Sequence, residues 1–392
     1  MKTIKLAYGE TFLTAGIEEK RIKEIVESPL NSYRSGTDSL TLVQNALDDP
    51  VDTAPLSEIA KDKRRIVILA NGKHRPTPER FTIPVILDRI FAGDPDADVT
   101  VLVATGGYGM MQQDALERRF GRDVMERARF VCHDVENPES MVQIDTLPTG
   151  TALYVCKEAV NADLLISEGS IAPHYLAGFT SAAMSVLPGI ASRDSIRGAQ
   201  NAASKEMAGA GVTENNGFYN DILFAARTAG VTFTLNVVLN LDRDIVFSAA
   251  GSLEGAQTAC EEMLRTKCAI SPRSSSYMLL SAGGAPLDHT FWGGLRALTT
   301  AEPMLEENSV VILATGCENG VGKPMAWQSR QLERALARSR IVCISEIPDD
   351  ELADLGLIPA DSIESAVRKA DRLIGGEQPM TIIPDAASLI VS

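Results

Sequence analysis

The chain has only four histidines, and its six cysteines are scattered singly. No CxxC pair or other spacing that would hold zinc occurs among the cysteines. Most of them lie in apolar, strand-like runs, where a reduced thiol behaves as a small hydrophobic side chain. We therefore predict unpaired, structural cysteines and no zinc site. The residues in question are Cys132, Cys156, Cys260, Cys268, Cys317 and Cys343.

Long apolar runs and excess positive charge are also missing. No run reaches the roughly 18 to 20 apolar residues of a membrane span, and the opening MKTIKLAYGE alternates like a strand rather than a signal peptide. The net charge is −15, from 52 acidic and 37 basic residues, so the overall field repels nucleic acid and anionic lipid. These absences predict a cytoplasmic protein with no nucleic-acid or membrane partner. Its oligomeric state is left open.

Standard nucleotide motifs are absent as well. The sequence has no GxxxxGK[ST], and no clean GxGxxG lies between a strand and a helix. What it does have is 392 residues, of which 45% are apolar. A chain of this length exceeds one ordinary core, so we expect two domains.

The repeating unit is a short apolar run that ends in small residues and leads into a helical pattern. Residues 64–79, 99–114, 276–291 and 309–324 all follow it. Continuous apolar strands alternating with helices predict an α/β fold with mainly parallel sheets. In such sheets ligands bind beyond the carboxyl ends of the strands, where these turns lie.

A change of pattern divides the chain. VTFTLNVVLNLDRDIVFSAAG predicts an antiparallel hairpin that reverses at Leu-Asp-Arg-Asp, and AISPRSSS, from residue 269, has the polar, proline-bearing composition of a linker. We therefore expect two α/β lobes, residues 1–270 and 271–392. The cleft between two lobes is the default site for a ligand and the expected active site.

The loop NGKHRPTP follows one buried strand and gathers Lys73, His74 and Arg75 in front of Pro76 and Pro78. Arginine at this edge offers a planar fork for a carboxylate or phosphate, and the prolines stiffen the loop. The alternative is a solvated basic turn. We predict that these three cationic residues bind a substrate anion.

His174 follows the apolar strand ADLLIS through a Gly/Pro loop. A lone histidine is often only a hydrogen-bonded structural residue, but its place at a strand tip favours a catalytic role. His133 in FVCHD and His289 in PLDHTF fit caps or local hydrogen bonding better.

These motifs together resemble the nickel-pincer lactate racemase family. The resemblance rests on the RPTP loop, VLVATG, HD at 133–134, GSIAPH followed by AGFTSAAMSVLPGIA, and GGAPLDHTFWGGLRAL, which occur in order across nearly the whole chain. It implies two α/β lobes with the active site between them and racemisation or epimerisation of 2-hydroxy acids. It also implies a nickel-pincer nucleotide as hydride acceptor and a 2-keto acid intermediate.

Carried over residue by residue, the resemblance places His174 at one acid/base position and Tyr108 at the other, where the family has histidine. Arg75 stands at the position that grips the substrate carboxylate, and Arg296 replaces a lysine in the same role. Gly72 stands where the family has an acidic residue, and Gly293 where it has a glutamine.

The cofactor positions differ more. Met184 replaces the lysine that can link covalently to the cofactor, and Gln200 replaces the nickel-binding histidine. Methionine cannot form an amide, and glutamine is a poor nickel ligand compared with imidazole. We assign Met184 and Gln200 to the cofactor site together with Gly106 and Gly107 of the GGYG turn, and we assign no confident metal ligand.

Three hypotheses follow. The first is a racemase or epimerase of a 2-hydroxy or sugar acid that uses the pincer nucleotide without a covalent link. The second keeps the fold but is a nickel-independent isomerase, lyase or hydrolase that depends on His174. The third is a non-catalytic carboxylate-binding or regulatory protein.

Overall fold

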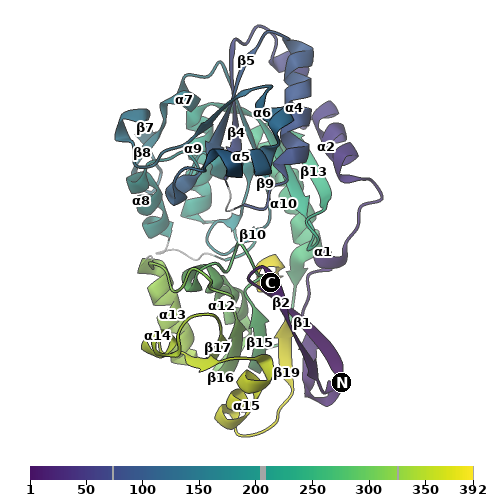
Figure 1. Ribbon diagram of the computed structural model, residues 1–392, viewed down its shortest axis with the longest axis vertical. Coiled ribbons are helices and arrows are strands. Elements are labelled where there is room, and N and C mark those ends of the chain that lie inside the picture. Colours follow the sequence, from purple (N-terminus) through teal and green to yellow (C-terminus); the bar gives the residue numbers. More distant parts are fainter. Residues whose placement is uncertain (73–74, 204–208, 325, 392) are drawn as a thin grey trace.

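The computed structural model describes residues 1–72, 75–203, 209–324 and 326–391, which form two α/β lobes stacked along the long axis of the molecule (Figure 1). Both lobes have a six-stranded sheet, as the apolar strand runs predict. The prediction of an α/β fold with mainly parallel sheets is confirmed.

The sheet of the first lobe has the order β13-β12-β9-β4-β5-β6. The strands from β12 to β6 are parallel, and β13 runs antiparallel to β12. The predicted hairpin is confirmed, with Leu239 opposite Ile245 at its turn. The strands are β4 (Arg65–Asn71), β5 (Asp98–Ala104), β6 (Arg129–Cys132), β9 (Leu164–Ser170), β12 (Val231–Leu239) and β13 (Ile245–Gly251).

Helices cover both faces of this sheet because its strands are apolar on both sides. In β4, Ile66 and Ile68 join one core cluster, while Val67 and Leu69 join the opposite one. Alternate residues of a strand point to opposite faces, so a continuous apolar run buries both. The first cluster includes α2 (Ser39–Asp48), α4 (Glu79–Gly93) and α5 (Gln113–Phe120), and the second includes α8 (Arg193–Ala203) and α9 (Gly217–Ala229).

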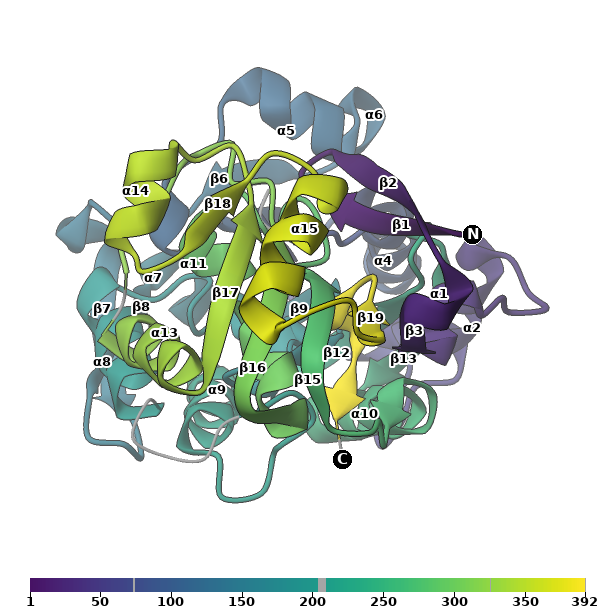
Figure 2. The same cartoon turned by 90° about the horizontal axis from the view of Figure 1, so that it is seen from below.

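The second lobe contains an all-parallel sheet in the order β18-β17-β16-β15-β19-β3. Figure 2 shows this lobe in front, with α15 (Ile363–Ile374) crossing its strands. The opposite face packs against α12 (Arg296–Ala301) and α13 (Ala326–Arg338). The strands are β15 (Ser275–Ser281), β16 (Leu305–Ala314), β17 (Ser339–Ile344), β18 (Ile358–Ala360), β19 (Met380–Ile383) and β3 (Ile22–Ile25).

The first 25 residues of the chain pack with the second lobe. Strand β3 pairs with β19 in parallel, and the hairpin of β1 (Lys2–Tyr8) and β2 (Thr11–Ile17) contributes Ile4 and Leu6 to the core beneath α15. The division of the chain near residue 270 stays a prediction. To it we add that the second lobe also takes its edge strand from the N-terminal segment.

The cysteines are free thiols, and burial raises the pKa of all six, that of Cys268 to about 11. Of the six, only Cys132 is partly exposed. Thiols of this kind stay protonated and pack as apolar groups. Within the described ranges, no helix has the length and apolar character that crossing a membrane requires.

Candidate active site at the lobe junction

The loop after β4 brings Arg75 toward the ends of the neighbouring strands. Gly72 N–H donates to the Ala104 carbonyl at 3.1 Å, and Arg75 N–H donates to the Gly72 carbonyl at 3.2 Å. A Cβ at position 72 would lie 3.1 Å from the Ala104 oxygen, so this close approach to β5 favours glycine. Lys73 and His74 lie outside the described residues, and their predicted role as anion ligands stays a prediction.

The guanidinium of Arg75 donates from Nη2 to the sulfur of Met184 at 3.3 Å. Burial lowers the pKa of Arg75, and the nearby Arg296 lowers it further, while Tyr108 acts in the opposite direction. Met184 is almost fully buried, at 4% exposed, in the 3-10 turn η4 (Ala182–Ser185). The structure therefore brings together Arg75 and Met184, two of the residues predicted for the site.

His174 ends the short strand β10 (Pro173–His174), which Figure 1 shows at the boundary between the lobes. Its Nδ1 accepts hydrogen bonds from the backbone N–H groups of Ala177, at 3.0 Å, and Leu176, at 3.3 Å. An Nδ1 that accepts must be unprotonated, so the neutral ring has its hydrogen on Nε2. Burial lowers the pKa of His174 well below its usual range, and the positive charges of Arg75 and Arg296 lower it further.

An aromatic stack joins the two lobes beside His174. The ring of Tyr175 stacks on His174 with centroids 4.5 Å apart, and on Trp327 of α13 with centroids 5.0 Å apart. The guanidinium of Arg296, at the start of α12, lies over the same tyrosine ring at 5.2 Å. Stacked rings and cation–π contacts of this kind fix side-chain orientation. His174 and Arg296 therefore both contact one aromatic residue at the junction. Arg75 lies near enough that its charge adds to the burial that lowers the pKa of His174 and opposes the rise that burial causes in the pKa of Tyr175.

This cluster has excess positive charge in an acidic protein. Among the ion pairs of the described ranges, neither Arg75 nor Arg296 has a carboxylate partner. The Nε of Arg296 donates to the Gly293 carbonyl at 2.7 Å, which orients the fork. Burial raises the pKa of the Asp385 carboxyl, and the charge of Arg296 opposes this rise, but no ion pair of the described residues joins the two groups. Two guanidinium groups outside any such ion pair attract a small anion.

Tyr108 belongs to the 3-10 turn η2 (Gly106–Tyr108), and its side chain is 68% exposed. Gly106 has a φ of +56° and donates its N–H to the Gly189 carbonyl at 2.8 Å, which ties this turn to the segment after η4. A Cβ at Gly107 would meet open space. The electrostatic effect on Arg75 places Tyr108 near the cluster, but its predicted place opposite His174 stays a prediction.

Gln200 lies on α8, which packs against η2. Its Oε1 is buried and has no hydrogen-bond partner among the described residues, and a buried oxygen of this kind could accept from a bound donor or contact a cation. In the part of the chain that the structure describes, no group of three or more His, Cys, Asp or Glu side chains could hold a metal. Met184 cannot form an amide link. Among the described residues of this site, the side chains fit a cofactor held without a covalent bond, with Gln200 as a candidate ligand, and position 184 does not fit a lysine link.

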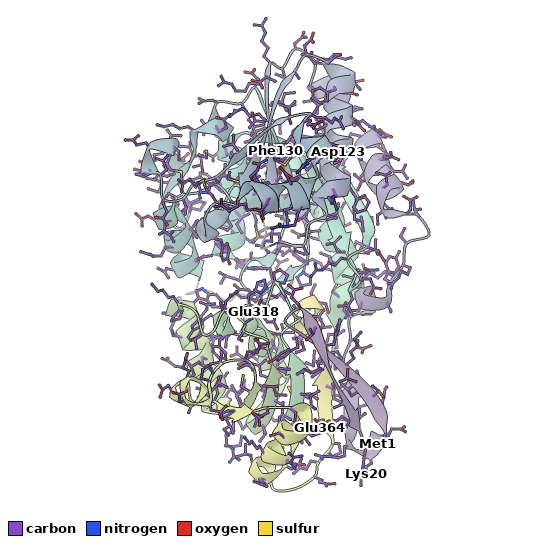
Figure 3. The ribbon with its side chains drawn as sticks, viewed as in Figure 1. Met1, Lys20, Asp123, Phe130, Glu318 and Glu364 are labelled. Atoms are coloured by element: carbon purple, nitrogen blue, oxygen red, sulfur yellow. The ribbon has the colours of Figure 1, made fainter. Side chains whose placement is uncertain are left out.

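The remaining described histidines have local roles. His133 is fully buried, its Nε2 donates to the Ala191 carbonyl at 3.2 Å, and burial lowers its pKa to about 4. His289 pairs with Glu318, which Figure 3 shows on the side of the second lobe that faces the first. The cap of the helix that follows is Thr290.

Some residues at this junction were not foreseen from the sequence. Tyr175 is adjacent to His174 in the chain, but its stacking partner Trp327 comes from the other lobe, and nothing in either segment indicates the other. Arg119 contacts the Arg75 loop from α5 and looks in the sequence like one more charge in the exposed run LERRF. Of these unforeseen residues, Thr77 alone lies in a recognised sequence motif, the RPTP loop, so its role could have been considered from the sequence.

Fold and side chains define a two-lobed α/β protein with cationic and aromatic groups gathered where the lobes meet. Comparison with known proteins agrees along the whole chain. Residues 8–211 match the lactate racemase N-terminal domain and residues 323–391 match the lactate racemase C-terminal domain. The chain therefore belongs to the lactate racemase family.

Individual relatives show how far the similarity extends. The chain is 31% identical to a lactate racemase of Thermoanaerobacterium thermosaccharolyticum, covering 100% of this chain and 99% of the relative. It is 29% identical to a lactate racemase of Lactiplantibacillus plantarum, with 100% of both chains covered. The structure of the lactate racemase apoprotein from T. thermosaccharolyticum matches with a TM-score of 0.93 at 30% identity over 100% of both chains.

Proposed function

We propose that this protein is an isomerase that binds a small 2-hydroxy acid or sugar acid between its lobes and inverts the configuration at C2. The observation that supports the proposal best is that the charges of Arg75 and Arg296, one from each lobe, both act to lower the pKa of His174 and of Tyr175, while neither arginine belongs to an ion pair of the described residues. A planar guanidinium binds a carboxylate through two parallel hydrogen bonds. A substrate held by both lobes has its C2 near the imidazole.

In this proposal His174 orients the substrate through a hydrogen bond and, in this tautomer, does not itself accept the 2-hydroxyl proton, which passes to solvent on the side of Tyr108. The neutral ring has its hydrogen on Nε2, so it donates to the 2-oxygen of the substrate. The Tyr108 hydroxyl takes the second acid/base position and exchanges its proton with solvent, consistent with its exposure. The imidazole of His174 and the hydroxyl of Tyr108 differ in proton affinity, so proton transfer is favoured in one direction. This difference suits an epimerase better than a racemase that interconverts two enantiomers equally.

A pincer nucleotide, when bound, supplies a reversible hydride acceptor for the C2–H bond. Gln200 is the described residue that would contact its metal, Gly107 leaves open space beside the GGYG turn, and Gly106 would contribute to the site through its backbone. Arg75 and Arg296 would hold the substrate carboxylate in either configuration.

One observation favours a second candidate, a nickel-independent isomerase, lyase or hydrolase on the same fold. Both protein attachments of the family's cofactor, the lysine and the histidine, are replaced, by Met184 and Gln200. In that case His174 and the two arginines would act on the acid without a metal.

The test combines activity with cofactor content. Protein is purified from a host that makes the pincer nucleotide, and its nickel content and near-ultraviolet absorbance are measured. Lactate, longer 2-hydroxy acids and aldonic acids are then assayed by chiral chromatography. Conversion that requires nickel and is lost in Arg75→Lys supports the proposal. Conversion that survives chelation supports the second candidate, and binding without conversion contradicts both.

A further inference from the structure

The loop that contains Arg75 is held in place by a second arginine. Arg119, in the last turn of α5, donates from Nη2 to the backbone carbonyl of Arg75 at 2.8 Å and to the Glu79 carboxylate at 2.5 Å. A longer contact of 3.5 Å reaches the Thr77 carbonyl. One guanidinium therefore joins the start of α4, the Arg75 backbone and α5.

The ion pair below the loop is deeply buried. The side chain of Glu79 is 1% exposed and that of Arg119 is 17% exposed. Burial raises the pKa of Glu79 well above its usual range, and the charge of Arg119 opposes this change. Buried ion pairs add little net stability because desolvation offsets their attraction. The main effect of the Glu79–Arg119 ion pair is therefore on the geometry of the loop that contains Arg75, and its effect on the free energy of unfolding is small.

The same loop is tied to the strand that leads to His174. The hydroxyl of Thr77 accepts hydrogen bonds from Asn71 Nδ2, at 3.1 Å, and from Ser170 N–H, at 3.2 Å. Ser170 is the last residue of β9, four positions before His174. Shifts of this loop would therefore move Arg75 relative to His174.

We propose that Arg119 is a positioning residue that sets the place of the Arg75 guanidinium without touching the substrate. The ion pair with Glu79 fixes the position of the Arg119 guanidinium, and this guanidinium donates the hydrogen bond that fixes the backbone carbonyl of Arg75. The kinetic part of this inference rests on the proposed function, and the part that concerns loop order does not.

The kinetic test compares Arg119→Met and Arg119→Lys with Arg118→Met as a matched control. Arg118 is the preceding residue of the same helix, but it is exposed and pairs only with Asp114 one turn away. For Arg119→Met we expect KM for the hydroxy acid to rise roughly tenfold, the worth of one hydrogen bond to a charged group, with a smaller change in kcat. Lysine at 119 should restore part of the loss, because it still pairs with Glu79.

The double variant Glu79→Gln/Arg119→Met guards against misfolding, because it removes both partners of the ion pair and leaves no ionised carboxylate at position 79. The other buried carboxyl near Arg119, that of Glu168, keeps its hydrogen bond from the Thr82 hydroxyl in this variant. If it folds and keeps the wild-type KM, the inference is overturned. An equal rise in KM for Arg118→Met also overturns it.

Hydrogen exchange of residues 75–82, followed by mass spectrometry, tests loop order without any activity. We expect faster exchange in the double variant than in Arg118→Met, with the rest of the first sheet unchanged. Equal exchange rates overturn the inference. A wild-type protein that converts no hydroxy acid contradicts the proposed function alone, because the exchange result still decides the role of Arg119.

Discussion

The guanidinium of Arg75 donates a hydrogen bond to the thioether of Met184, at 3.3 Å, so the residue that we predict at the family's lysine position supports the arginine that we propose to bind the substrate. A sulfur acceptor is weak and uncharged, which suits a neighbour that must leave the guanidinium free for an anion. Met184 thus has a local role that does not depend on a covalent cofactor.

Replacing Met184 with leucine should weaken binding of the acid. Leucine keeps the apolar volume but removes the acceptor, and we expect KM to rise by up to about tenfold. Steady-state kinetics with Met304→Leu, a buried change in the second lobe, as control would measure it. Met184→Lys should lower the melting temperature, because it buries a second cation beside Arg75. A lysine variant as stable as wild type would contradict this reading of the contact.

The hydrogen bonds to His174 predict one tautomer and one charge state. Because Nδ1 accepts two backbone N–H groups and burial lowers the pKa well below its usual value, the ring should be neutral with its hydrogen on Nε2. Nitrogen NMR of selectively labelled protein reports the tautomer directly. A spectrum with hydrogen on Nδ1 near neutral pH would refute the donor role proposed for this residue.

His133 should make stability depend on pH. Its pKa is about 4 in the folded protein and about 6.5 when unfolded, so the unfolded chain binds the extra proton first. The contribution is present above pH 6.5 and is lost as the pH falls toward 4, by about 3 kcal/mol of unfolding free energy. Urea unfolding of wild type and His133→Gln across this range would measure it. Parallel curves for the two proteins would contradict the prediction.

Restoring the family's ligand should change metal content. In Gln200→His an imidazole replaces an amide oxygen, and imidazole binds nickel more strongly. We expect more nickel per chain in protein from a host that makes the pincer nucleotide, measured by mass spectrometry of the metal. Gln328→His, at a buried glutamine of the second lobe, serves as control. Equal nickel in both variants would argue against a cofactor site near residue 200.

The sequence predicts the parts of this fold that depend on local pattern. Apolar runs such as RIVILAN bury both faces of a parallel strand, and the reversal at Leu-Asp-Arg-Asp indicates the β12–β13 hairpin without knowledge of the rest. The pairing of β3 with β19 could not be foreseen, because the sequence pattern of a strand does not indicate which other strand it pairs with.

The same limit applies to the site. Arg75 and His174 could be proposed as site residues because each follows a buried strand at the expected edge, and their catalytic and binding roles stay predictions. Their supports, Arg119 and Trp327, come from elements distant in the chain, and only the packing of helices and lobes brings them into contact. Residues that act directly on a ligand are thus easier to find from sequence than residues that hold others in place.

The pairing of Ile22 with Met380 also bears on how the molecule is made. During synthesis the whole first lobe leaves the ribosome before β19 does, so β3 lacks its partner strand throughout that time. The second sheet can therefore gain this edge only after the first lobe has been made, although β3 precedes that lobe in the chain.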